Sequence, residues 1–558
     1  MVETTKLGEA DMHLMHNFYI FVTALFMSLI MVPAIRKWAF DSGAVDFPGE
    51  RRVHNRAVAR AGGVAIFIPF LFSILVYSEM NREVRGILAG SLIIFFTGLI
   101  DDLYQLSAKR KFIGQFSGCL VAILVGHLYL MDLGNLFGLG DIFLGDWWGI
   151  VLSLFALVGV VNALNLIDGL DGLAAGVSAI SLLAFCWLGL QENNLTVLAL
   201  SAGMLGALLG FLKYNSFPAQ IFMGDNGSLV VGFVLGCLAI AMTQNEGSAV
   251  SAVVPLMILS VPITDTLVVM FGRGLRGQNP FKPDRTHLHH KIMALGFEHS
   301  LTVLLICSLS LIWALLALAF RSSPDIYLFG VLVVGTVAQH LGLNSLVKRK
   351  GRLHELWVNI RGHVQASRIQ AGVAKLSGVV DALIFSSLLV YALSSWTLQL
   401  TGLNFWLVVT GFVSGLSGLF MLLSGRVPHS VIYLLLLWPV LLINFQFEVE
   451  GSQEWWWLTL GQVTNVLFVV LAILLAYKFI VLKSLDHVLD FSLEFLLFAM
   501  GLTLAVVSPD VDLAFHLSGV VSRGIIIFLA LRFITIGSYG RILLSAVVID
   551  LSLLIMAI

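Results

Sequence analysis

Apolar runs close to the length of a membrane span recur along the whole chain, separated by short polar segments. A helix needs about 20 apolar residues to cross a bilayer. Unpaired backbone groups are too costly in lipid, so such runs form helices or barrel strands, and these runs lack the period-two alternation of barrel strands. The pattern predicts an all-α polytopic integral membrane protein, with about 10–11 transmembrane helices in residues 1–345 and about 7 in residues 376–558.

The composition also indicates a membrane protein. Of the 558 residues, 58% are hydrophobic and 12% are charged, against about 25% charged residues in a soluble domain. All four cysteines lie in apolar runs without metal-ligand spacing, which is typical of packing residues. The acidic N-terminus lacks the pattern of a cleavable signal, so the first span, residues 16–35, is expected to remain as a helix.

The charged residues are segregated between alternate loops. Basic residues gather in the segments 36–60, 109–111, 273–291 and 348–375. The segments 131–148 and 447–454 carry acidic residues and no Lys or Arg. Because Lys and Arg concentrate in short cytoplasmic loops, this alternation predicts an extracytoplasmic N-terminus and cytoplasmic basic loops.

The polar motifs divide the chain into three regions. Residues 1–345 contain every motif-bearing loop and are expected to form one membrane domain. Residues 346–375 are predicted to be a basic cytoplasmic linker, and residues 376–558 an additional transmembrane region whose role the sequence does not indicate. We find no sequence repeat that links the two halves.

The first motif is the acidic pair Asp101 and Asp102, at the predicted cytoplasmic end of an apolar run. A solvated helix end is the simpler interpretation, since charge is cheaper at the interface than at the bilayer centre. The functional interpretation is an oxygen cluster for a divalent cation or a phosphate-handling site. Lys111, in the basic segment that follows, lies within reach of an anionic lipid headgroup.

The second motif is NALNLIDGLDGLAAG, which interrupts two apolar runs. It places Asn162, Asn165, Asp168 and Asp171 within ten residues, with a glycine after each aspartate. A glycine-rich turn with capping side chains would need only one Asp-Gly pair. A polar cluster at membrane level therefore favours a functional site.

The third motif, FMGDNGS, places Asp225 between Gly224 and Gly227, just before another apolar run. The glycines permit a tight turn and a close backbone approach, and a helix N-terminus favours anions. A capping aspartate would give the same pattern, so this motif alone does not decide between the two interpretations.

The fourth motif, NPFKPDRTHLHHK, crowds Asp284, Arg285, His287, His289 and His290 into one predicted cytoplasmic loop. A hydrated loop is the simpler interpretation, and zinc is a second one because imidazole is a good zinc ligand. The histidines lack i, i+4 spacing and have no nearby cysteine, so a cationic cluster that binds pyrophosphate fits better. Together, the four motifs supply carboxylates, cations and glycines, which are the parts that phosphoryl transfer requires.

In this order, the four motifs resemble the polyprenyl-phosphate N-acetylhexosamine-1-phosphate transferase family, over residues 15–345. The segment with His54 and Arg60 is similar to the family's first cytoplasmic loop, although Ala57 and Ala59 stand where prolines are usual. The histidine loop resembles the branch that uses UDP-GlcNAc or a related UDP-HexNAc. The runs after residue 376 have no counterpart in the usual family members.

The resemblance implies transfer of N-acetylhexosamine-1-phosphate, GlcNAc-1-phosphate foremost, from a UDP-sugar to undecaprenyl or another polyprenyl phosphate, with release of UMP. The lipid-diphosphate sugar would initiate synthesis of a cell-surface polysaccharide. The enzyme would lie in the bilayer of the bacterial inner membrane with its site facing the cytoplasm. No nucleic-acid partner is implied, and a second copy of the chain is a candidate partner.

The resemblance also assigns expected roles to residues of the motifs. The expected catalytic residues are Asp101, Asp102, Asp168, Asp171, His287, His289 and His290. The expected substrate-binding residues are His54, Arg60, Lys111, Asn162, Asn165, Asp284 and Arg285. Asp225 and Asp101 are the expected ligands of Mg²⁺, with Mn²⁺ as the alternative.

Three alternatives stay open at this point. The peptidoglycan branch of the family, which uses UDP-MurNAc-pentapeptide, usually shows a different histidine pattern. A transporter could place Asp and Asn at broken helices, but charges should then lie near the middle of the membrane. A metal-dependent hydrolase of lipid diphosphates would release phosphate rather than UMP.

Overall fold

The chain is almost entirely helical in the computed structural model, which describes residues 2–46, 57–244, 250–278 and 286–348, and two short strands further along. The helices are α1 (Val2–Ser42), α2 (Gly62–Tyr77), α3 (Arg82–Tyr104), α4 (Ala108–Gly126), α5 (Asp146–Ile167), α6 (Leu173–Gln191), α7 (Leu195–Asn215), α8 (Gly224–Thr243), α9 (Val253–Ile258), α10 (Ser260–Gly274), α11 (Leu288–Ala294), α12 (His299–Ala319) and α13 (Asp325–Lys348). The strands β4 (Glu454–Trp455) and β5 (Leu458–Thr459) pair antiparallel with each other.

Within the described ranges, eight helices are long and apolar enough to cross a membrane: α1 from His16, α3, α5, α6, α7, α8, α12 and α13. The prediction of a helical, multi-pass membrane protein is therefore confirmed for this part of the chain, which is predominantly helical. The larger count of 10–11 spans stays a prediction, because α2 and α10 are too short, at 16 and 15 residues, and α4 begins with three basic residues. Residues 349–558, apart from β4 and β5, lie outside the described residues, and with them the seven further spans and the predicted linker from residue 349 on. The first three residues of the predicted linker, 346–348, are the last residues of α13.

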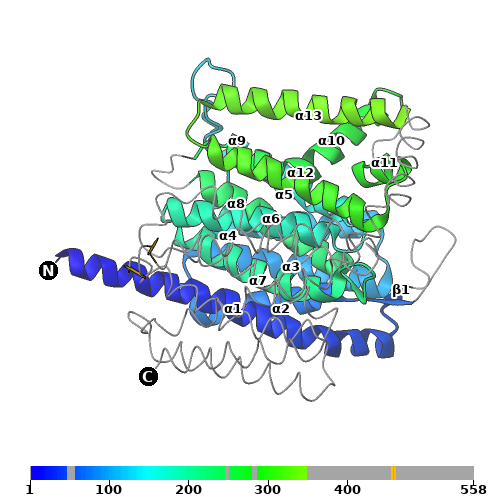
Figure 1. Ribbon diagram of the computed structural model, residues 1–558, viewed down its shortest axis with the longest axis horizontal. Coiled ribbons are helices and arrows are strands. Elements are labelled where there is room, and N and C mark those ends of the chain that lie inside the picture. The colour runs from blue at the N-terminus through cyan, green and yellow to red at the C-terminus, as the bar shows by residue number, and fades with distance from the viewer. Residues whose placement is uncertain are drawn as a thin grey trace. The chain divides into compact units, whose positions relative to one another are not determined.

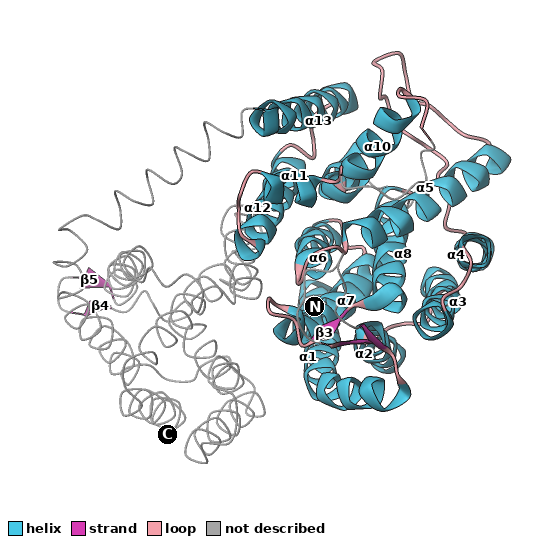
Figure 2. Ribbon diagram, turned by 90° about the vertical axis from the view of Figure 1, so that its right-hand side faces the viewer, coloured by secondary structure: helices cyan, strands magenta, loops and turns pink. Residues whose placement is uncertain are grey.

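The helices form a bundle with a buried centre and an apolar rim. In the span windows, 83% of the residues of α6, 94% of α7 and 89% of α8 are buried, against 22% of α1 and 11% of α13. Figures 1 and 2 both show α1 on one side of the bundle and α13 on the other. Exposed apolar side chains on the outer helices suit a lipid surrounding, where hydrocarbon rather than water covers them.

Small residues allow the outer helix α1 to pack closely on α7. A Cβ atom at Gly206 would lie 2.3 Å from the carbonyl oxygen of Phe21, and one at Gly210 would lie 2.6 Å from that of Leu25. Such close approach is how helices associate in lipid, where no hydrophobic gradient drives them together.

A three-stranded sheet at one end of the bundle departs from the all-helical expectation. Strand β1 (Val45–Asp46) pairs antiparallel with β2 (Val58–Arg60), which pairs parallel with β3 (Ile221–Phe222). Strands of two or three residues are too short to show an alternating pattern, so the sequence could not indicate them. The β2–β3 register sets Arg60 opposite Phe222, three residues before Asp225.

Candidate active site

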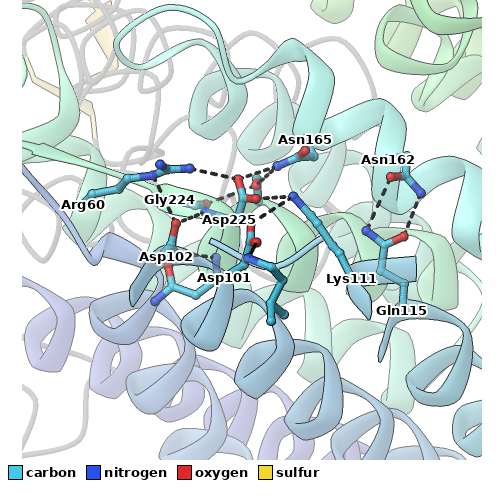
Figure 3. A network of polar contacts seen from close by, with 12 residues as sticks. Arg60, Asp101, Asp102, Lys111, Gln115, Asn162, Asn165, Gly224 and Asp225 are labelled. Atoms are coloured by element: carbon cyan, nitrogen blue, oxygen red, sulfur yellow. Dashed lines mark hydrogen bonds and ion pairs between the residues drawn. The ribbon is translucent and has the colours of Figure 1, made fainter. Parts of the chain in front are cut away.

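The helix ends and β2 bring residues from separate motifs into one polar cluster (Figure 3). Asp101 and Asp102 lie near the C-terminal end of α3, Lys111 lies in the first turn of α4, and Asp225 lies in the first turn of α8. Residues that are up to 165 positions apart in the sequence are therefore within contact distance.

Asp225 is the centre of this cluster. Its Oδ2 accepts an ion-paired hydrogen bond from Lys111 Nζ, and its Oδ1 lies 3.5 Å from Arg60 Nη2. The amide Nδ2 of Asn165, on α5, donates to Asp225 Oδ1 at 3.1 Å and to Ser228 Oγ at 2.8 Å. The Asp225 side chain keeps 15% of its surface exposed, so it remains open to a ligand.

Asp102 holds the N-terminus of α8. Its Oδ1 accepts the backbone N–H of Asp225 at 3.0 Å, and its Oδ2 accepts that of Asn226 at 2.9 Å. Arg60 Nε lies 3.1 Å from Asp102 Oδ1, and only 1% of the Asp102 side chain is exposed. Both oxygens are committed to α8 and Arg60, so this carboxylate positions the neighbouring groups, and its expected catalytic role stays a prediction.

Asp101 is the more open member of the pair. Its Oδ1 accepts the backbone N–H of Leu106 at 2.7 Å, and its Oδ2 lies 3.5 Å from Lys111 Nζ. Lys111 therefore bridges Asp101 and Asp225 and fixes the distance between α3 and α8 at this end of the bundle.

Glycines allow the backbones of the site to approach one another. A Cβ at Gly63 would lie 2.2 Å from the backbone nitrogen of Gly227, and one at Gly98 would lie 2.5 Å from the Cα of Asn226. Gly224 has a φ of +72°, a left-handed conformation that favours glycine. The motif thus needs its glycines for packing and for the turn into α8.

Burial and charge set the proton affinities of two groups outside the spans. Burial disfavours the charged guanidinium of Arg60, but Asp102 and Asp225 outweigh that effect, so the pKa of Arg60 is raised. Burial, followed by the negative charge of Asp225, raises the pKa of Asp168 to about 7. Burial is the larger of these two causes, so the carboxyl of Asp168 binds its proton more tightly than an exposed aspartate does.

Asp171 supports the loop between α5 and α6. Its Oδ2 accepts the backbone N–H of Ala219 at 2.9 Å, and its own backbone N–H donates to Nε2 of His299 at 3.1 Å. Gly172 N–H donates to the side chain of Asn215 at 3.0 Å. The loop that carries Asp168 is thereby tied to the chain just before β3.

Asn162 lies apart from the carboxylates. Its Nδ2 donates to Gln115 Oε1 at 2.9 Å, and Gln115 Nε2 donates back to Asn162 Oδ1 at 3.4 Å (Figure 3). This reciprocal amide pair joins α4 to α5. The structure therefore brings Asn165, but not Asn162, into direct contact with Asp225.

The histidine segment approaches the Asp168 loop from α11. A Cβ at Gly169, next to Asp168, would lie 2.6 Å from Nε2 of His289. Burial lowers the pKa of His289 to about 4. A neutral imidazole near pH 7 follows from this burial, and the expected role of His289 in neutralising phosphate charge stays a prediction. His54, Asp284 and Arg285 lie outside the described residues.

The donor chemistry of the cluster fits a hard divalent cation. The cluster contains more carboxylates than cations. The carboxylates are Asp101, Asp102, Asp168 and Asp225, and the cations are Arg60 and Lys111. Within the described ranges, no three His, Cys, Asp or Glu side chains converge as a ready coordination shell. Mg²⁺ is usually held by only one or two carboxylates together with waters and substrate phosphates. A cluster in which carboxylates outnumber cations can supply that number.

Three polar residues of this region were missed by sequence reasoning: Gln115, Ser228 and Asp265. Asp265 lies in the apolar run VPITDTLVVMF, and an ionisable residue inside such a run is by default a functional candidate. That signal could have identified Asp265. Gln115 and Ser228 carry no comparable signal.

The fold and the site define a polytopic membrane protein with a carboxylate-rich, cation-paired centre at one end of its helices, suited to phosphate chemistry. The sequence model described as Glycosyl transferase family 4 matches residues 84–243. A relative from Bacillus subtilis (strain 168), "Probable undecaprenyl-phosphate N-acetylglucosaminyl 1-phosphate transferase", is 36% identical over 320 residues, which are 56% of this chain and 88% of the relative.

Two further relatives agree. The "Decaprenyl-phosphate N-acetylglucosaminephosphotransferase" of Mycolicibacterium smegmatis is 34% identical over 51% of this chain and 77% of its own length. The "Undecaprenyl-phosphate alpha-N-acetylglucosaminyl 1-phosphate transferase" of Yersinia pestis is 32% identical over 50% of this chain and 76% of its own length. The chain belongs to glycosyl transferase family 4, in the group of polyprenyl-phosphate N-acetylhexosamine-1-phosphate transferases.

Proposed function

We propose that this protein transfers GlcNAc-1-phosphate from UDP-GlcNAc to a polyprenyl phosphate such as undecaprenyl phosphate, and releases UMP. The observation that carries the proposal is Asp225, set between Lys111 and Arg60 at the N-terminus of α8 with Asp101 and Asp168 nearby. The names of the relatives support this donor and acceptor. No observation favours the MurNAc-pentapeptide or transporter alternatives.

The reaction joins two phosphates. An oxygen of the lipid phosphate forms a bond to the phosphorus that carries the sugar, and the bond from that phosphorus to the bridging oxygen breaks, so that UMP leaves with this oxygen. The bond between sugar C1 and its oxygen stays intact, so the anomeric configuration is kept. Such a transfer asks the protein mainly for positioning and charge neutralisation.

The residues of the site divide these tasks. Asp225 and Asp101 would hold Mg²⁺ or Mn²⁺, which would neutralise charge on the donor's diphosphate. Lys111 and Arg60 add positive charge on either side of Asp225. Asp102 keeps α8 and Arg60 in place, and Asn165 orients the carboxylate of Asp225.

Direct attack by the lipid phosphate is the simpler route. A phosphate monoester has a second pKa of about 6, so much of the acceptor is already a dianion at pH 7 and needs no general base. The Asp102 oxygens are bound to backbone N–H groups, and the Asp225 oxygens face two cations, which makes both poor nucleophiles. The contacts of Asp102 and Asp225 therefore disfavour a phospho-aspartate on either of these two residues.

Isotope exchange separates the two routes. Rigorously delipidated enzyme with UDP-GlcNAc and labelled UMP, but no lipid acceptor, should incorporate no label into the donor. Incorporation without acceptor would require a covalent intermediate and would contradict direct attack.

The function itself is tested with membranes that contain the protein, undecaprenyl phosphate and a panel of UDP-sugars. We expect UMP release and a lipid-linked sugar with UDP-GlcNAc, dependent on Mg²⁺ and abolished by a chelator. Release of inorganic phosphate without UMP would instead favour a lipid-diphosphate hydrolase. Turnover with UDP-MurNAc-pentapeptide and not with UDP-GlcNAc would favour the peptidoglycan branch.

A further inference from the structure

We infer that Asp265 of α10 is a positioning residue that sets the tautomer of His287 and holds the histidine segment against the Asp168 loop. The inference rests on the proposed function, because it assigns the histidine segment a part in the same transfer. Asp265 is 2% exposed and lies in the middle of an apolar helix, where an ionisable side chain needs a specific partner.

Both oxygens of Asp265 are used on the histidine segment. Oδ1 accepts the backbone N–H of Leu288, the first residue of α11, at 2.8 Å. Oδ2 lies 2.9 Å from Nδ1 of His287. One carboxylate thus fixes the backbone and the first imidazole of the segment at the same time.

The contact defines which nitrogen of His287 carries a proton. An ionised carboxylate can only accept hydrogen bonds, so the proton lies on Nδ1 of the imidazole. Nε2 is then the nitrogen that His287 can offer to another group. In histidine sites, the partner of one ring nitrogen commonly selects the role of the other in this way.

Ring contacts connect His287, which Asp265 holds, to the loop that carries Asp168. The rings of His287 and His289 lie nearly parallel, 6° apart, with centroids 6.1 Å from each other. The His289 ring in turn contacts Gly169, the neighbour of Asp168. Asp265 therefore connects the apolar helix α10 to the loop that carries the candidate catalytic residue Asp168.

Burial makes this connection difficult to replace. His287 and Asp265 are both more than nine-tenths buried, so loss of either one would leave a buried polar group of the other unpaired. His340 of α13 and Lys291 also lie within electrostatic range of this group. Neither can take the place of Asp265 as an acceptor for both Nδ1 of His287 and the backbone of Leu288.

The first test uses the wild-type protein. The protein is labelled with ¹⁵N-histidine, and the resonances of His287 are assigned by their loss in His287→Asn. We expect Nδ1 of His287 to be protonated. An unprotonated Nδ1 would overturn the inference whether or not the proposed reaction is observed.

The second test is the substitution Asp265→Asn. The amide can still accept from Leu288, but its NH₂ group faces Nδ1 and forces His287 toward the opposite tautomer. By analogy with the outer partners of other functional histidines, kcat should fall about 10- to 100-fold. The KM for UDP-GlcNAc should change less than about threefold, because the lost interaction belongs to the transition state.

A double-mutant cycle separates positioning from general destabilisation. If Asp265 acts through His287, Asp265→Asn combined with His287→Asn should be no slower than His287→Asn alone. Additive losses of kcat would overturn the inference. Asp325→Asn is the matched control, because Asp325 also accepts a backbone N–H, that of Asn135. Asn135 lies in the loop after α4, at the other end of that helix from Lys111. This substitution should leave kcat unchanged.

The outcomes also separate failure of the proposed function from failure of the positioning role of Asp265. Wild-type protein that releases no UMP from UDP-GlcNAc in the presence of polyprenyl phosphate would remove the proposed function, while the protonation state of His287 would still decide the role of Asp265. Wild-type activity together with normal kcat in a folded Asp265→Asn variant would remove the positioning role alone.

Discussion

The carboxylate of Asp225 contacts three polar side chains, and these side chains come from three other elements. Asn165, Lys111 and Arg60 reach it from α5, α4 and β2. The sequence indicated Asp225 as a hard oxygen ligand. It could not indicate that two cations would lie beside it, since one of them depends on the pairing of two very short strands.

We expect Asp225→Asn to reduce transfer by orders of magnitude while the protein stays folded. The amide keeps the size of the side chain but removes the charge that would attract a divalent cation. Turnover is measured as UMP release over a range of Mg²⁺ concentrations, and folding as the apparent melting temperature in detergent. Asp141→Asn, in an exposed loop, is the control and should behave as wild type.

Normal turnover in a folded Asp225→Asn variant would show that Asp225 is not the ligand. Restored activity at high Mg²⁺ would instead agree with a weakened site. The two results differ in the Mg²⁺ dependence and can be told apart in one titration.

His289 gives a pH-dependent stability with a definite sign. Its pKa is lowered by burial to about 4 in the folded protein, against about 6.5 in an unfolded chain. As pH falls from about 6.5 to about 4, the unfolded chain takes up a proton that the folded protein does not, so stability falls. The contribution is fully present above pH 6.5.

The measurement is the apparent melting temperature in detergent between pH 7 and pH 4. His289→Gln should show a shallower loss over this interval than wild type, because glutamine takes up no proton. His16→Gln, at an exposed position of α1, should keep the wild-type slope. Equal slopes in wild type and His289→Gln would contradict the lowered pKa.

Hydrophobic patterning predicted most elements, because membrane helices must satisfy their own backbone hydrogen bonds. It could not predict the sheet β1–β2–β3, whose strands have two or three residues each. It also could not predict that Asn162 would pair with Gln115 rather than with the carboxylates, since both asparagines lie on the same helix. For elements, the sequence does not indicate how each helix is rotated about its axis or which neighbouring helix each of its faces contacts.

The contact between α3 and α8 sets the distance between the Asp101–Asp102 pair and Asp225. Gly98→Ala would place a Cβ 2.5 Å from the Cα and 2.6 Å from the backbone nitrogen of Asn226. Because this neighbour is backbone, the helices must separate, at a cost of about 1–3 kcal/mol. A displacement of this kind should lower kcat up to about 100-fold.

Gly330→Ala is the matched control, since a Cβ there meets nothing within 4 Å. Its melting temperature and kcat should match the wild type. If Gly98→Ala also behaved as wild type, the close approach of α3 and α8 would not determine the geometry of the site.

For the whole molecule, the alternation of basic and acidic loops predicts which side of the membrane holds the site. Lys111 lies in the first turn of α4, and the acidic loop with Asp141 follows the end of the same helix. A cysteine at Asp141 should react with an impermeant thiol reagent added to intact cells, and one at Lys282 should not. The reverse result would contradict a site that faces the cytosolic supply of UDP-sugar.

The native cysteines give the background for this labelling. Cys119, Cys237 and Cys307 are buried, and Cys186 is half-buried. A wild-type control should therefore show little labelling, and permeabilised cells should allow labelling at Lys282 as well.

The last prediction concerns residues 376–558. The 320 residues aligned with the B. subtilis relative are 88% of that relative but 56% of this chain, and among the described residues the contacts around Asp225 involve residues before 229. A protein truncated after Lys375 should therefore insert into the membrane and still form UMP and lipid-linked sugar. Insertion is scored by membrane fractionation and transfer by the undecaprenyl phosphate assay, with truncation after Gly210, which removes Asp225, as the inactive control. A stable, inserted protein without activity would show that the C-terminal spans complete the active site, and the division into a catalytic and an additional membrane region would be wrong.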